Sequence, residues 1–480
     1  MGEARVVAKN TGVLVLVEVA RKVFGLLLFM AIARVLGAEN FGILAFGLAL
    51  AELLGVINKF GFEPFILREV ARYREKAQSY WANTAIIKIF LSIPYLAVVA
   101  ATAYFMGVKD LKLTVVYICS IDTIFQNFVL HNCDFFRAYQ KAEYEAITRL
   151  SLSAMYWLLG WGIIILGYGL LELVVVLASV KFLSFCISLY LIHTKISPIR
   201  LKFQPEVAKE VIKGALPFLA MAVVTMIQGR VGVVILSPMK GDVVTGMYAA
   251  AMRLWMIFSF IPVGIRGGFL PAMSKYAAAS AGEQIGKAFR YSFKYLLIIG
   301  LPVAVASTVM PDRIIGFVYG PKFSAAGEIL QIVMWGLLLT FLNYTFGFVL
   351  IAVNRERAFL MILSISAGIS VASNLVLVSF FSATGAAISL LLSQGFVFVA
   401  GLYYARPYLE VDLELLNTLL KPLLSGLVMA AALTMLPRWN LLLVLPLGVM
   451  IYLCFLIVIQ TFNTEERSIV RDFARTLVGA

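Results

Sequence analysis

The sequence predicts an all-α polytopic membrane protein with fourteen transmembrane helices. Of its 480 residues, 62% are hydrophobic and 14% are charged, whereas soluble domains average roughly 45–50% apolar and 25% charged residues. The apolar residues gather in long runs, and a membrane-spanning helix needs about 20 of them. The connections between the runs are short, so they leave no room for a soluble catalytic domain.

Each predicted span is an apolar run bounded by polar or charged residues. In chain order the spans are 11–35, 40–62, 79–106, 112–136, 146–167, 170–193, 214–236, 243–269, 291–310, 326–352, 358–380, 384–405, 418–437 and 441–462. Arg5 and Lys9 precede the first run, as in a signal peptide. That run also holds Glu18, and it is longer than the 7–15 residues of a signal peptide's apolar core. We therefore interpret it as the first transmembrane helix.

Lysine and arginine are concentrated in alternate connections. One set holds Arg68, Arg72, Arg74, Lys76, Lys141, Lys195, Arg200, Lys202, Lys209, Lys275, Lys287, Arg355, Arg357 and Arg406. The opposite set holds Lys109, Lys112, Lys240, Arg313, Lys322 and Arg438. Cytoplasmic loops carry the excess of lysine and arginine, and an even number of spans puts both termini on one side. We expect a multi-pass plasma-membrane protein with both termini in the cytoplasm.

The net charge of +14 has a simple explanation in this arrangement. Basic residues in cytoplasmic loops are attracted to anionic lipid headgroups. The bilayer is therefore the expected partner of these charges, and no nucleic-acid partner is predicted.

An internal repeat accompanies the predicted spans. Gly37 and Gly42 bracket the start of the second span, and Gly241 and Gly246 recur 204 positions later at the start of the eighth. Six spans are an even number, so both copies insert with the same orientation, as in the parallel repeats of transporters. The alternative is chance, because glycine is common at helix starts.

The repeat predicts two six-helix lobes followed by two additional helices. The N-terminal lobe covers residues 1–194, and a cytoplasmic linker covers 195–213. The C-terminal lobe covers 214–405, and the last two spans with a cytoplasmic tail cover 406–480.

Motifs for catalysis and metal binding are missing from the sequence. Gly-rich phosphate loops, HExxH and GxSxG do not occur. The four cysteines form no CxxC pair and the two histidines have no partner at ligand spacing: Cys119, Cys133, Cys186, Cys454, His131 and His193. We predict no enzyme activity, no catalytic residue, no metal and no cofactor.

Basic residues interrupt several of the apolar runs. A cation near the bilayer midplane costs about 2.5–3.5 kcal/mol on insertion scales, and such residues usually face a polar interior. Glu18, Arg21, Lys22 and Gly25 follow helical spacing on one face of the first span. The alternative is a structural ion pair from Glu18 to Lys22, but one carboxylate cannot neutralise two cations. We expect this face to line a cavity.

Further candidates lie in the second, seventh and eighth spans. Arg230 and Arg253 are the strongest pair in the second lobe. Lys59 is near the cytoplasmic end of its span, where it lines the cavity or extends to the interface. Arg266 lies in Pro262–Gly268, a segment that borders a cavity or forms an ordinary proline kink. Together, the predicted substrate-binding residues are Glu18, Arg21, Lys22, Lys59, Arg230, Arg253 and Arg266.

Other charged residues in the spans have less specific interpretations. Lys88 and Lys181 are single cations that pair with Asp122, Asp134 or Glu172, and the sequence does not choose between these partners. If transport is coupled to a proton or sodium gradient, the candidate coupling residues are Glu18, Glu52 and Asp122.

Several segments resemble the polysaccharide-biosynthesis flippases, the Wzx or polysaccharide-transport branch of the multidrug/oligosaccharidyl-lipid/polysaccharide exporter superfamily. The resemblance lies mainly in the first 75 residues and is carried by Arg34-Val-Leu-Gly-Ala-Glu-Asn-Phe-Gly42, Phe60-Gly-Phe62 and Leu67-Arg-Glu-Val-Ala-Arg72. Val318-Tyr-Gly-Pro-Lys-Phe323 and Asn354-Arg-Glu356 extend it toward the C-terminus.

The resemblance implies a MATE-like fold and a flippase function. Members move isoprenoid-pyrophosphate-linked oligosaccharides from the cytoplasmic to the outer leaflet by alternating access of two lobes, for cell-surface polysaccharide assembly. The pyrophosphate is an anion that buried arginine and lysine would recognise. A glycan polymerase and glycosyltransferases are the implied protein partners.

Three alternatives are kept open. The related lipid II flippases also have a cationic cavity, but their Asp-Ala-Phe stretch after the first span is not evident here. Multidrug exporters are expected to use carboxylate-lined cavities for cationic drugs, whereas the charges in these spans are mostly basic. A membrane scaffold without transport would need no cations inside its spans.

Overall fold

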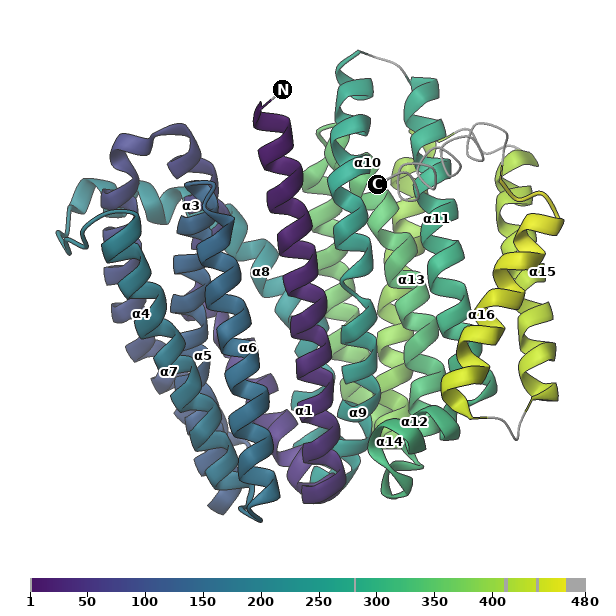
Figure 1. Ribbon diagram of the computed structural model, residues 1–480, viewed down its shortest axis with the longest axis horizontal. Helices are drawn as coiled ribbons and strands as arrows, with labels where there is room; N and C mark the ends of the chain where they lie inside the picture. Colours follow the sequence, from purple (N-terminus) through teal and green to yellow (C-terminus); the bar gives the residue numbers. More distant parts are fainter. Residues whose placement is uncertain (1, 280–281, 410–412, 437–439, 463–480) are drawn as a thin grey trace. The chain divides into compact units, whose positions relative to one another are not determined.

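The computed structural model describes residues 2–279, 282–409, 413–436 and 440–462, and it describes side chains over the same ranges except 2–16, 71 and 413–418. The described chain consists of helices joined by short connections (Figure 1). The predicted all-α class is thereby confirmed.

The helices follow one another closely along the chain. The first part contains α1 Gly2–Leu54, α2 Val56–Lys59, α3 Phe62–Arg72, α4 Ala77–Phe105, α5 Asp110–Ala138, α6 Ala142–Ile165, α7 Leu170–Lys195 and α8 Pro205–Lys240. The second part contains α9 Asp242–Phe258, α10 Ile261–Ala278, α11 Gly282–Val309, α12 Pro311–Tyr319, α13 Ala326–Ala352, α14 Glu356–Ala405, α15 Leu413–Met435 and α16 Leu441–Val458.

Eleven of the described helical segments are long and apolar enough to cross a membrane. Two of them, in α1 and α14, contain a non-helical residue where two spans were predicted, at Gly37 and at Ser382. The shorter apolar segment Leu419–Met435 corresponds to the thirteenth predicted span. Helix is therefore present in every predicted range, because long apolar runs can satisfy their backbone groups in a membrane only by forming helices.

Two predicted spans are interrupted where the sequence suggested continuous helices. Span 40–62 runs through the end of α1 at Leu54 and the short α2, and α2 is separated from α3 by Phe60 and Gly61, which adopt left-handed backbone conformations. Span 243–269 divides into α9 and α10 at residues 259–260, just before Pro262. Proline cannot donate a backbone hydrogen bond inside a helix, so it is favoured in the first turn after such a break.

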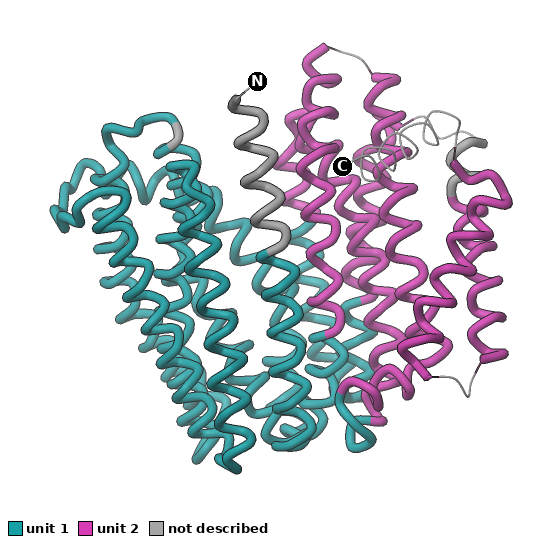
Figure 2. Tube along the Cα trace, in the orientation of Figure 1, with its two compact units in different colours: residues 1–253, 319–323, 363–390 teal, residues 254–318, 324–362, 391–480 magenta. Residues whose placement is uncertain are grey.

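The described chain forms two compact units (Figure 2). The first comprises residues 1–253, 319–323 and 363–390, and the second comprises 254–318, 324–362 and 391–480. In the first unit α1 packs on α5 and α6, and α5 packs on α7. In the second unit α11 packs on α13 and α15. The predicted lobe boundaries at residues 194, 213 and 405 remain a prediction.

Each unit has its own apolar core. In the first unit, Phe62, Phe65, Tyr80 and Phe136 are almost fully buried where α3, α4 and α5 meet. In the second unit the core is formed between α11, α13 and α16 by residues that include Phe289, Leu301, Phe346, Val444 and Leu456. The polar side chains described next lie in the first unit.

Candidate functional site

The charged face of the first span is present on α1. Glu18 forms an ion pair with Arg21, with Nε and Oε2 3.1 Å apart, at the i, i+3 spacing of neighbouring helical residues. About a third of each side chain is accessible. Glu18 thus pairs with Arg21, and its charge also acts on Lys22.

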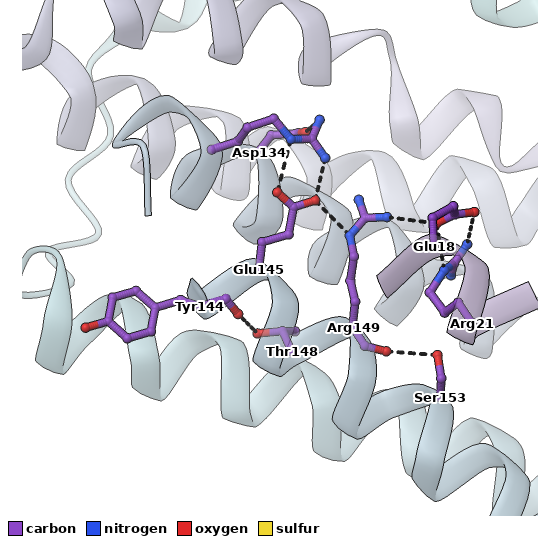
Figure 3. A network of polar contacts seen from close by, with 9 residues as sticks. Glu18, Arg21, Asp134, Tyr144, Glu145, Thr148, Arg149 and Ser153 are labelled. Carbon is purple, nitrogen blue, oxygen red and sulfur yellow. Dashed lines mark hydrogen bonds and ion pairs between the residues drawn. The ribbon is translucent and has the colours of Figure 1, made fainter. Parts of the chain in front are cut away.

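A longer chain of ion pairs extends from this face into α6 and α5 (Figure 3). Glu18 also lies 3.9 Å from Arg149, and Arg149 lies 2.9 Å from Glu145. Glu145 is almost completely buried and lies 2.5 Å from the Nη2 atom of Arg137. Arg137 in turn lies 3.2 Å from Asp134. We call Asp134, Arg137, Glu145, Arg149, Glu18 and Arg21 the ion-pair chain.

The sequence analysis did not identify this chain beyond Glu18 and Arg21. Two of its ion pairs are local, because Asp134 and Arg137 are three positions apart and Glu145 and Arg149 are four apart. Such spacings predict contacts between side chains on one helix. The sequence therefore carried a signal for these two ion pairs. The link from Arg149 to Glu18 joins α6 to α1, and only the packing of these two helices creates it.

The two arginines predicted in the second lobe lie near the same face. Arg230 on α8 forms an ion pair with Glu52 of α1. Arg253, the last residue of the first unit, places its guanidinium 3.3 Å from the centre of the Phe29 ring. This is a cation–π contact, which desolvation strengthens.

Four of the predicted cations are brought together in the first unit. Lys22 lies close enough to Arg21, Arg230 and Arg253 for their charges to act on it. Arg253 is likewise influenced by Arg230 and by Glu52. We call Arg21, Lys22, Arg230 and Arg253 the cation cluster. Within the cluster, Glu18 pairs with Arg21 and Glu52 pairs with Arg230.

The other two predicted site residues, Lys59 and Arg266, remain predictions. Lys59 forms an ion pair with Glu63, 3.1 Å away, at the junction of α2 and α3. Arg266 is exposed on α10 and belongs to the second unit.

Lys88 and Lys181 have neutral hydrogen-bond acceptors in the described structure. Lys88 donates to the backbone oxygen of Asn127 over 2.9 Å. Lys181 donates to Gln126 and lies 5.0 Å from the centre of the Tyr156 ring. The charge of Asp122 acts on Lys181, while the Asp122 carboxylate accepts a hydrogen bond of 2.7 Å from Tyr156.

The repeated glycines also meet in the first unit. Gly37 and Gly241 have nearly the same backbone angles, with φ of 81° and 83°. A Cβ atom at Gly42 would lie 1.8 Å from the backbone oxygen of Asp242, and one at Gly246 would lie 2.1 Å from that of Ala38. The starts of two predicted spans from different halves of the repeat therefore cross in direct backbone contact.

A polar contact reinforces this crossing. Lys112 of α5 lies 2.5 Å from the carboxylate of Asp242 and 2.6 Å from the hydroxyl of Ser237. Its ammonium also lies 4.5 Å from the centre of the Phe46 ring. The sequence analysis had assigned Lys112 only to a basic-poor connection, and nothing local in the sequence indicated Asp242 as its partner.

Comparison with protein-family models assigns the chain to a family. The sequence model of the family described as "Polysaccharide biosynthesis protein" matches residues 7–277, which is more than half of the chain. The chain belongs to this family. The MatE family model matches residues 217–376. These are transporter families, so the expectation that the protein is a membrane transporter rather than an enzyme is confirmed.

Related proteins from bacteria and archaea support the assignment. The chain is 23% identical over 325 residues to the "Putative O-antigen transporter" of Shigella dysenteriae, a match that covers 67% of this chain and 80% of the relative. It is 22% identical over 169 residues to the "Probable low-salt glycan biosynthesis flippase Agl15" of Haloferax volcanii, covering 35% of this chain and 36% of the relative.

Solved structures confirm a fold shared with MurJ and MATE transporters. A lipid II flippase MurJ in an inward closed conformation matches with a TM-score of 0.72 at 15% identity, over 93% of this chain and 99% of the other. An inward-facing multidrug resistance MATE transporter matches with a TM-score of 0.66 at 15% identity, over 81% of this chain and 94% of the other. At this identity the likeness concerns the fold alone.

Proposed function

We propose that this family member translocates isoprenoid-pyrophosphate-linked oligosaccharides from the cytoplasmic to the outer leaflet of the plasma membrane. The observation that supports this function most directly is the cation cluster of Arg21, Lys22, Arg230 and Arg253. The names of the Shigella and Haloferax relatives, which refer to O-antigen transport and to glycan flipping, agree with it.

The charge of the cluster fits this substrate. All four members are cations, and a pyrophosphate diester carries two negative charges that they would attract. Charge-assisted hydrogen bonds from arginine to phosphate are roughly twice as strong as neutral ones.

The proposed transport path uses two six-helix lobes formed by the repeat, with fourteen spans and both termini in the cytoplasm. The lobes alternate access to the headgroup site while the isoprenoid chain stays in lipid. Glycosyltransferases supply the lipid-linked substrate on the cytoplasmic side, and a polymerase uses it on the outer side.

Substitution of Arg253 tests the role of the cluster. Arg253 is held by an aromatic ring, so its loss removes a cation without leaving a carboxylate unpaired. We expect Arg253→Ala to lower flipping of a pyrophosphate-linked lipid in proteoliposomes at least about tenfold, since each lost charge-assisted hydrogen bond is worth about 1.5–3 kcal/mol. Lys109→Ala, which removes an exposed cation from a connection, is the control and should transport normally.

Depletion of the protein from its native cells distinguishes the candidate functions. Accumulation of a pyrophosphate-linked glycan on the cytoplasmic leaflet would identify the substrate, and accumulation of lipid II would favour the peptidoglycan precursor. Drug sensitivity without a lipid intermediate would instead support multidrug extrusion, the function named for the MATE structure. Normal transport by the combined Arg21, Arg230 and Arg253 alanine variant would reject the cationic site.

A further inference from the structure

Two of the segments that resemble the flippases meet in the first unit. Phe41 belongs to the segment 34–42 of α1, and Tyr319 and Phe323 belong to the segment 318–323. The centre of the Phe41 ring lies 6.0 Å from that of Tyr319 and 5.8 Å from that of Phe323. Each of the three side chains is at most 2% exposed. The segments are therefore joined by a buried group of aromatic rings.

The bend at Gly37 brings a fourth ring to this group. Phe29 and Phe41 are twelve positions apart in the sequence, which would be about 18 Å along a straight helix at 1.5 Å per residue. Their ring centres are instead 6.1 Å apart, with the ring planes at 89°. Gly37, with its φ of 81°, lies between them and turns the chain back. We call Phe29, Phe41, Tyr319 and Phe323 the aromatic support.

The aromatic support carries the guanidinium of Arg253. Its Cζ atom lies 3.3 Å from the centre of the Phe29 ring. A guanidinium perpendicular to the ring at this distance would push a nitrogen into the ring carbons, so the group lies along the ring face. All five N–H donors of arginine lie in the guanidinium plane. This orientation directs them past the ring edge, where a phosphate can bind through two of them.

Tyr319 also contacts the helix that carries Arg253. Its hydroxyl donates a hydrogen bond of 3.1 Å to the backbone oxygen of Ala250. Ala250 precedes Arg253 by three positions in α9, so this bond reaches the helical turn from which the arginine projects. The Tyr319 ring packs on Phe41 at the same time. One residue therefore contacts both the backbone of Arg253 and the ring group beneath its guanidinium.

The sequence of the segment 318–323 accounts for its placement. Gly320 adopts a φ of 88°, a conformation that glycine reaches at little cost. Pro321 begins a short helical turn, in which the N–H of Phe323 donates to the Gly320 oxygen over 3.2 Å. As a result, Tyr319 and Phe323 are both buried, whereas Lys322 between them is exposed.

We propose that Tyr319 and Phe323 are positioning residues that hold the Arg253 guanidinium for phosphate binding. This proposal rests on the proposed function, because the phosphate is that of the pyrophosphate headgroup. An unrestrained arginine loses side-chain freedom when it binds an anion. A guanidinium that is already held on a ring loses less, so the aromatic support raises the affinity for the headgroup without touching it.

Calorimetry of the purified full-length protein tests this role. The probe is farnesyl-pyrophosphoryl-N-acetylglucosamine, a soluble lipid with a pyrophosphate diester. Tyr319→Phe keeps the ring and removes the hydrogen bond to Ala250. Phe323→Leu keeps an apolar side chain and removes the ring contact with Phe41. We expect each variant to bind the probe about threefold to tenfold more weakly than the wild type, the loss that corresponds to freeing one ordered side chain.

Matched variants elsewhere in the first unit are the controls. Tyr80→Phe removes the hydroxyl of another buried tyrosine, which donates to Glu210 over 2.7 Å. Phe136→Leu removes another fully buried ring, which packs on Tyr144. Both variants should bind the probe with wild-type affinity. Lys322→Ala removes the exposed cation of the segment itself and should also bind normally.

The arginine itself separates positioning from a structural role. When Arg253→Ala is already present, Tyr319→Phe and Phe323→Leu should cause no further loss of affinity, because contacting residues that act through one another are not additive. Arg253→Lys keeps the charge without the planar guanidinium and provides a second background with tighter binding. There the two substitutions should have a smaller effect than in the wild type.

The possible failures are distinguishable. If the wild type does not bind the probe, the proposed function itself is rejected. If the wild type binds it and neither Tyr319→Phe nor Phe323→Leu binds it more weakly, the positioning role is rejected while the cation cluster stands. Equal losses with and without Arg253 would overturn the proposal in favour of a structural role. Weaker binding by Lys322→Ala, with normal binding by Tyr319→Phe, would overturn it in favour of direct anion binding by the segment.

Discussion

At the scale of single residues, the structure assigns different roles to cations that look alike in the sequence. Arg21 and Arg230 each have a carboxylate partner, whereas Arg253 is held by the Phe29 ring. Lys59 pairs with Glu63 at the junction of α2 and α3. A basic residue within a span can thus pair with a carboxylate or pack on an aromatic ring, and only the packed structure shows which.

Glu145 is the residue of the ion-pair chain whose loss should be most costly. Glu145→Gln leaves Arg137 and Arg149 without a shared carboxylate in a buried position, and breaking a buried pair costs about 3–5 kcal/mol. We expect a clear fall in the thermal unfolding temperature in detergent. The matched change Glu283→Gln removes an exposed partner of Lys287 and should leave that temperature unchanged. Equal effects of the two substitutions would contradict a structural role for the chain.

At the scale of helices, the two repeat-related glycine pairs have different functions. Gly37 and Gly241 supply the positive φ that interrupts the helix. Glycine adopts a positive φ at little conformational energy cost, whereas other residues do so at a higher cost. Gly42 and Gly246 instead allow two backbones to touch. Lys112 and Asp242 hold the helix starts together beside this crossing.

Enlarging Gly42 should separate these helix starts. In Gly42→Leu the side chain would overlap the backbone of Asp242, which cannot move aside as a flexible side chain can. Overpacking typically costs about 1–3 kcal/mol. We therefore expect a lower unfolding temperature and a weakened Lys112–Asp242 ion pair. Gly25→Ala is the control in the same helix, because a Cβ there meets nothing within 4 Å. Unchanged stability of Gly42→Leu would argue against the crossing.

At the scale of the whole molecule, the basic connections predict an orientation in the membrane. Exposed Arg200 lies in the basic-rich connection between α7 and α8, and exposed Lys109 lies in a basic-poor one between α4 and α5. The positive-inside rule puts the first connection in the cytoplasm and the second outside.

Cysteine labelling measures this orientation. Arg200→Cys and Lys109→Cys each remove one exposed cation, so they are matched variants in a background without the four native cysteines. An impermeant maleimide applied to intact cells should label only the variant at position 109. In inside-out vesicles it should label only the variant at position 200. The reverse pattern, or labelling of both from one side, would reject the predicted orientation.

The sequence alone determined the helices, the membrane class and the family. These properties depend on local information: apolar runs long enough to span a bilayer, glycine and proline at the breaks, and the segments around Gly37–Gly42 that resemble the flippases. The sequence also selected four cations that the structure brings together on α1, α8 and α9.

Only the tertiary structure decided which charges compensate one another. Glu18 and Arg149, Glu52 and Arg230, and Lys112 and Asp242 are far apart along the chain. Helical periodicity indicates which face of one helix is polar, but it does not say which helix packs against that face. For this reason the ion-pair chain, the glycine crossing and the aromatic support of Arg253 emerged only when the helices were packed together.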